Sequence, residues 1–166
     1  MNTTTFGQEF LRELEEEIVA SRKCIERVPE SLFDWKPHEK SMQMGYLTLL
    51  VADIPKWITV TAEKGEIDLL MWEKHKLTTT ENLLKYFDEN VAETKKVLST
   101  VTDETLFEMF YLKMGDKELM KSTRKDSISS SLRHWVHHRG QLTVYLRLND
   151  IPVPSLYGPS ADDKTF

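Results

Sequence analysis

The chain has little of what marks an exported or membrane-spanning protein. Its 166 residues contain one cysteine, Cys24, which excludes an internal disulfide and agrees with a reducing compartment. No apolar run approaches the roughly 20 residues that a membrane span needs. The first residues, MNTTTFGQEF, have neither the basic nor the apolar stretch of a secretory signal. We therefore expect a cytoplasmic protein without a membrane partner.

An excess of positive charge is also missing, since 27 acidic residues outnumber 22 lysines and arginines. The formal net charge is −5 and the isoelectric point is near 5.6, whereas nucleic-acid binding depends mainly on clustered lysine and arginine. This balance argues against a DNA or RNA partner. The hydrophobic fraction of 40% and the charged fraction of 30% are those of an ordinary globular protein. At this length we expect residues 1–166 to form a single domain.

Apolar residues recur at intervals of three and four residues in four long segments, which predicts four helices. The second is expected to begin at an N-cap, Ser41, and to be kinked by Pro55, and the third opens with Thr78 and Glu81 in the spacing of a capping box. The expected helices cover about Phe6–Val28, Ser41–Ile58, Thr78–Thr102 and Asp126–Asn149. The fold class predicted is all-α, an antiparallel four-helix bundle whose long second connection covers one end.

The segment from Leu106 to Met120, between the third and fourth helices, has no helical pattern. Its sequence, LFEMFYLKMGDKELM, is compatible with a short hairpin that turns at Gly115 and Asp116 or with an irregular lid. Both interpretations stay open at this point.

The fourth helix carries the candidate chemistry. On a helical projection, His134, His138, Gln141 and Tyr145 form a polar stripe between two apolar flanks, so we expect the stripe to face inward. Histidines four residues apart can both reach one metal ion. The alternative is a buried pair hydrogen-bonded to Gln141 or Tyr145, because an unpaired buried polar group costs about 1–3 kcal/mol. The spacing alone does not decide between the two.

Two blocks of sequence resemble the DinB/YfiT-like family of four-helix bundles. They are WKPHEKSMQMGYLTLLVADIPKW at 35–57 and HHRGQLTVYLRLNDIPVPSLYGPSADD at 137–163. The resemblance implies an up-down-down-up bundle, usually a homodimer, with a divalent metal held by three histidines near one end. Two of these ligands match His134 and His138, but the third position, in the second helix, is Leu50 here.

Leucine donates nothing to a metal, so another group must replace it or the metal is lost. The nearest replacement is Asp53, and two histidines with a carboxylate would suit Zn²⁺, Ni²⁺, Mn²⁺ or Fe²⁺. The other interpretation is that Asp53 is a solvated residue on the helix flank. His38 and His75 lie among charged loop residues, and we expect them at the surface. The candidate metal ligands are therefore His134, His138 and Asp53.

Three classes of function follow. The resemblance implies a metal-dependent enzyme, a transferase that moves a low-molecular-weight thiol to an electrophilic small molecule, or a hydrolase; the sequence identifies no catalytic residue. The second class, the alternative, is a metal-free small-molecule-binding bundle descended from such an enzyme. Leu50 favours it, but the presence of both His134 and His138 opposes a complete loss of the site, so the metal-dependent transferase is the leading interpretation. The third is a structural module that dimerises through exposed positions such as Trp72 and Phe110. For Cys24 we expect a buried structural role, and for Arg139 a pairing with an acidic residue of another helix.

Overall fold

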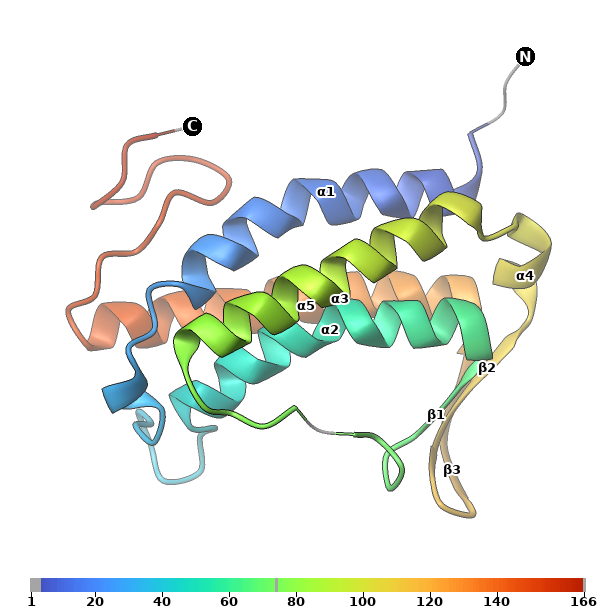
Figure 1. Cartoon of the computed structure of the whole chain (residues 1–166), viewed down its shortest axis with the longest axis horizontal. Helices are drawn as coiled ribbons and strands as arrows, with labels where there is room; N and C mark the ends of the chain where they lie inside the picture. The colour runs from blue at the N-terminus through green and yellow to red at the C-terminus, as the bar shows by residue number, and fades with distance from the viewer. Residues whose placement is uncertain (1–3, 74, 166) are drawn as a thin grey trace.

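The computed structural model describes residues 4–73 and 75–165. Four long helices lie side by side: α1 (Phe6–Ile25), α2 (Met44–Lys64), α3 (Thr80–Thr100) and α5 (Arg124–Leu148) (Figure 1). Helices α1 and α5 run in one direction and α2 and α3 in the other, as the colour gradient shows (Figure 1). This is the up-down-down-up order that the resemblance implies. Within it, α2 packs against both α3 and α5, and α1 packs against the same two helices.

The helix ends follow local hydrogen bonding, and two of them differ from the prediction. Helix α2 is preceded by Gln43 as N-cap, so the cap predicted at Ser41 is wrong. Helix α3 is capped by Thr79, whose side chain accepts a hydrogen bond from the Asn82 backbone N–H at 3.1 Å, and not by Thr78. The helical pattern extends across both candidate threonines, so it could not distinguish them. Helix α2 continues through Pro55.

The core is formed by the inward faces of the four long helices. Its largest fully buried apolar side chains come from all four, and α5 alone contributes Trp135, Leu142 and Leu146. The opposite flank of α5 is different, because Val144 and Leu148 are more than half exposed. The polar stripe of α5 therefore lies at the boundary between core and solvent, and the prediction that it faces inward holds only for its buried member, His138.

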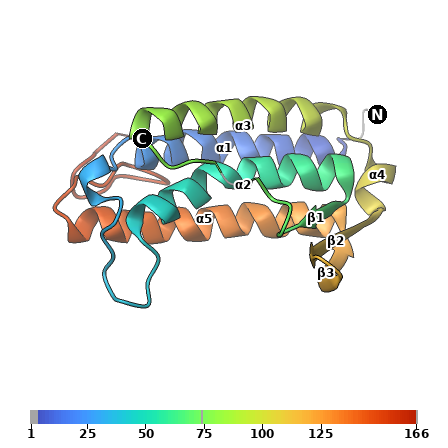
Figure 2. The same ribbon diagram turned by 60° about the horizontal axis from the view of Figure 1, so that its bottom comes forward.

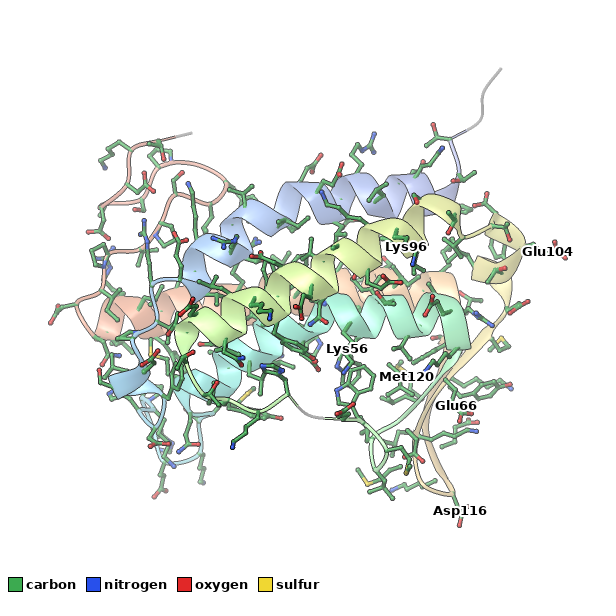
Figure 3. All side chains as sticks on the ribbon, in the orientation of Figure 1. Lys56, Glu66, Lys96, Glu104, Asp116 and Met120 are labelled. Carbon is green, nitrogen blue, oxygen red and sulfur yellow. The ribbon has the colours of Figure 1, made fainter. Side chains whose placement is uncertain are left out.

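A small sheet corrects the all-α prediction. Strands β2 (Met109–Met114) and β3 (Lys117–Thr123) form the hairpin that was one of the two interpretations of this segment. Gly115 in its turn has φ +59°, a conformation that favours glycine, and Asp116 lies at the tip (Figure 3). A third strand, β1 (Glu66–Asp68), pairs with β2 in parallel. Two short helical segments, η1 (Glu30–Leu32) and α4 (Asp103–Phe107), complete the elements.

The connection between α2 and α3 returns along the whole bundle, because those two helices are parallel. After β1, residues 69–73 and 75–79 pass in front of α2 between the sheet end and the start of α3 (Figure 2). We call this segment the crossover. Among the described residues, no helix is long and apolar enough to span a membrane.

Candidate functional site

The two histidines of α5 form a hydrogen-bonded pair. Their Nε2 atoms are 2.6 Å apart, and the ring centroids are separated by 4.3 Å. His138 is buried, whereas His134 is exposed. The Oε1 of Gln141 lies 2.7 Å from Nδ1 of His138, so Nδ1 donates and, in a neutral ring, Nε2 is an acceptor. His134 must then donate from its own Nε2.

The surroundings favour neutral imidazoles. Partial loss of hydration lowers the pKa of both rings below the ordinary value of 6.5; His138 and then His137 lower the pKa of His134 further, and His137 does the same for His138. For His138 the hydrogen bond with Gln141 acts in the opposite direction. Tyr145, the other predicted partner, instead donates to the Met42 carbonyl oxygen at 3.2 Å.

Asp53 of α2 is a buried acceptor, with 8% of its surface exposed. The interpretation of this residue as solvated is therefore wrong. Oδ2 accepts hydrogen bonds from the indole N–H of Trp57 at 2.8 Å and of Trp72 at 3.0 Å. Oδ1 accepts from the hydroxyl of Tyr86. These donors come from α2, the crossover and α3, so one carboxylate joins three segments.

Residues of the crossover take part in the same cluster. His75 stacks on the Tyr86 ring, with centroids 3.9 Å apart and planes 12° from parallel, and its Nε2 lies 2.5 Å from Oδ1 of Asn82. The prediction of a surface histidine is wrong for His75 and is confirmed for His38, which is exposed. Trp72 is half-buried in this cluster and Phe110 is 2% exposed, so neither offers the exposed surface predicted for an interface.

These groups surround a cavity of about 500 Å³ between α2, the crossover and α5. Its lining is mostly apolar, and it includes Leu50, Asp53 and His134, so the position of the expected third ligand lines the same cavity as one of the two histidines. The lining residues are Tyr46, Leu49, Leu50, Asp53, Trp57, Leu69, Leu70, Trp72, His75, Met114 and His134. Sequence reasoning missed the contributions of the crossover and the hairpin, because no periodicity connects those segments to α2.

The side chains present do not fit a three-ligand metal centre. The histidine pair offers two nitrogens, Leu50 offers none, and both oxygens of Asp53 already accept hydrogen bonds. Within residues 4–73 and 75–165 no group of three or more histidine, cysteine, aspartate or glutamate residues is arranged to hold a metal ion. The assignment of His134, His138 and Asp53 as ligands therefore stays a prediction.

Two other residues behave as the sequence indicated. Cys24 is fully buried, and burial raises the pKa of its thiol to about 11, which makes it a poor nucleophile at neutral pH. Arg139 is 1% exposed and forms an ion pair with Glu17 of α1 at 2.5 Å. Both residues serve the packing of the bundle and lie outside the cavity lining.

Comparison with known proteins gives a consistent result. A family model described as the DinB family matches residues 1–165. A DinB-like protein from Bacillus subtilis superposes with a TM-score of 0.67 at 19% identity, covering 94% of this chain and 99% of that one. A DinB-like protein from Bacillus cereus ATCC 10987 gives 0.65 at 16% identity, covering 89% and 95%. At these identities the likeness shows the fold alone. No curated protein matches the chain.

Proposed function

The chain belongs to the DinB family, and we propose that it is a small-molecule-binding member whose ligand occupies the cavity between α2, the crossover and α5. The observation that carries this proposal is the cavity itself, about 500 Å³ in volume and lined mainly by leucine, tryptophan, tyrosine and methionine. Small-molecule sites in proteins have this size and character, with a few polar groups at fixed positions. Here those groups are Asp53 and His134.

The mouth of the cavity also suits an organic ligand. Leu70 is 68% exposed and Met114 is 45% exposed, although both line the cavity. Flexible apolar side chains at an entrance can adapt to ligands of different shape. Their exposed surface is the area that a bound apolar molecule would cover.

The test is direct binding of the neutral ligand phenylbutanol, followed by tryptophan fluorescence, because Trp57 and Trp72 line the cavity. We expect saturable binding to the native protein. Leu50→Trp should fill the cavity and weaken binding at least about tenfold. The matched control is Leu84→Trp on α3, a half-buried leucine outside the lining. Equal binding by both variants would contradict the proposal.

The second candidate is a metal-dependent transferase of a low-molecular-weight thiol. One observation favours it: the Nε2 atoms of His134 and His138 lie only 2.6 Å apart. Two nitrogens bound to one tetrahedral zinc at 2.0–2.1 Å would lie roughly 3.3 Å apart, so a small opening of the pair would admit a cation. The missing third ligand puts this candidate second.

Metal analysis distinguishes the two candidates. The metal content of the purified protein is measured by mass spectrometry and compared with that of a His134→Ala/His138→Ala variant. A stoichiometric metal that is lost in the variant would place the transferase first. Metal-free protein after supplementation with Zn²⁺, Ni²⁺, Mn²⁺ or Fe²⁺ would remove it.

A further inference from the structure

The described lining of the cavity has an acidic side chain but no lysine or arginine. The acidic side chain is the carboxylate of Asp53. An anionic ligand would meet an unfavourable potential in this cavity, whereas a cation would meet a favourable one.

Asp53 is held in place by hydrogen-bond donors that carry no charge. Its partners, the two indoles and the Tyr86 hydroxyl, are neutral donors. Such donors stabilise a carboxylate without cancelling its charge. They also occupy both lone pairs of Oδ2 but only one of Oδ1. The carboxylate is therefore fixed in position by three segments of the chain.

The indole rings of Trp57 and Trp72 also favour a cation over an anion. Trp57 and Trp72 lie with ring centroids 5.1 Å apart, and both donate their N–H groups to Asp53. The face of an indole attracts cations, and a carboxylate on its N–H increases the electron density of the ring. Trp72 already attracts one ammonium group, since Nζ of Lys56 lies 5.0 Å from its centroid. Lys56 is outside the cavity lining.

We infer that the cavity selects an organic cation: an amine whose ammonium group lies against the Trp57 and Trp72 rings beside Asp53, with an apolar body against Leu49, Leu50 and Leu69. This inference rests on the proposed function, because it names the class of ligand for the same cavity. A neutral molecule of equal size would gain the apolar contacts alone. An anion would gain those contacts and be repelled by Asp53.

Three ligands with one skeleton test the inference on the native protein. Phenylbutylamine, phenylbutanol and phenylbutyrate share an apolar body and differ in charge, and their dissociation constants are measured by calorimetry near neutral pH. We expect the amine to bind at least about tenfold more tightly than the alcohol, and the carboxylate to bind most weakly. Higher salt should reduce the advantage of the amine.

The outcomes separate the two proposals. If the alcohol binds as tightly as the amine, or the carboxylate binds best, the inference is overturned and the proposed function stands. If none of the three binds, both are overturned. Asp53→Asn should abolish the preference for the amine and leave the affinity for the alcohol within about twofold.

A control variant removes the same charge elsewhere. Glu15→Gln breaks an exposed ion pair with Lys95, outside the cavity lining, and should leave the preference unchanged. Circular dichroism checks that Asp53→Asn is folded. Should that variant unfold, the comparison of the three ligands on the native protein still decides the inference.

Discussion

At position 50 an apolar side chain lines the same cavity as His134, one of the two hydrogen-bonded histidines of α5. If the family's ligand positions apply to this chain, a histidine at position 50 adds a third nitrogen to that pair. We expect Leu50→His to increase zinc affinity by more than roughly a hundredfold, since a third ligand commonly contributes several kcal/mol. Competition with a chelator of known affinity measures the change.

The control for this substitution places a histidine away from the pair. Val144 is 56% exposed on the outer flank of α5 and does not line the cavity, so Val144→His should leave zinc affinity within about twofold of the native value. If Leu50→His also stays within that range while the fold survives, position 50 does not face the histidine pair. The transfer of the family's ligand positions to this chain would then be misaligned.

The histidine pair also makes stability depend on pH. Burial lowers the pKa of His134 and His138 in the folded state, while in the unfolded chain both titrate near about 6.5. The unfolded state therefore binds more protons between the lowered and the ordinary pKa values. The free energy of unfolding is greatest above about pH 6.5 and should fall as the pH drops through that value. Urea unfolding at about pH 7 and about pH 5 measures the loss.

Part of that loss belongs to other groups, so the comparison needs variants. His134→Gln/His138→Gln should flatten the pH dependence, because the glutamines do not titrate. His38→Gln removes an exposed histidine and should leave the dependence as it is. An unchanged pH dependence in the double variant would show that the pair contributes nothing to it.

At the scale of elements, the structure and the sequence pattern assign the N-cap of α3 to two different, adjacent threonines. Thr79 accepts a hydrogen bond from the Asn82 backbone N–H, whereas Thr78 is exposed and precedes the cap. Thr79→Ala should lower the free energy of unfolding by about 1 kcal/mol. Thr78→Ala should change it by less than about 0.5 kcal/mol. The reverse order, measured by urea unfolding, would restore the capping box predicted from the sequence.

The sequence predicted the elements in which apolar residues recur at regular intervals. The four long helices were found because each buries one face, and the hairpin was among the alternatives because Gly115 and Asp116 mark a turn between alternating residues. Strand β1 has three residues and α4 has five, which is too short for a period to show. The position of β1 depends on its pairing with β2, and the position of α4 depends on where α3 ends. No local sequence pattern indicates either one.

The site was predicted in part for the same reason. His134 and His138 are one turn apart on one helix, so the spacing brought them together. The donors to Asp53 are 4, 19 and 33 residues away in sequence. Only the first can be found from helix geometry. Trp72 and Tyr86 reach the carboxylate because the crossover returns along α2, which is a consequence of the fold.

At the scale of the whole molecule, association stays a prediction from the family resemblance. Exposed apolar residues remain available for it, since Val144 and Leu148, one turn apart on α5, are 56% and 58% exposed. Burying such surface between two copies would lower the free energy of the pair. We expect sedimentation equilibrium at micromolar concentration to give the mass of a dimer. A monomer throughout that range would contradict the prediction.

A buried ion pair holds α1, α5 and the C-terminal segment together. The guanidinium of Arg139 is 2.5 Å from Oε2 of Glu17 and 3.2 Å from the Ser21 hydroxyl, and it donates to the Tyr157 hydroxyl at 2.5 Å. Removing one partner leaves a buried charge uncompensated, which commonly costs about 3–5 kcal/mol. We therefore expect Glu17→Gln to lower the free energy of unfolding by that amount, as measured by urea unfolding.

Two further variants test whether the loss of stability expected for Glu17→Gln arises because the charge on Arg139 is buried. Glu15→Gln breaks the exposed pair between α1 and Lys95 of α3 and should cost less than about 1 kcal/mol, because water screens that pair. Glu17→Leu/Arg139→Met replaces both buried charges by apolar groups, so it should recover most of the stability that Glu17→Gln loses. If Glu17→Gln costs no more than Glu15→Gln, the buried charge of Arg139 does not depend on Glu17. The hydroxyls of Ser21 and Tyr157 would then be sufficient to stabilise the guanidinium.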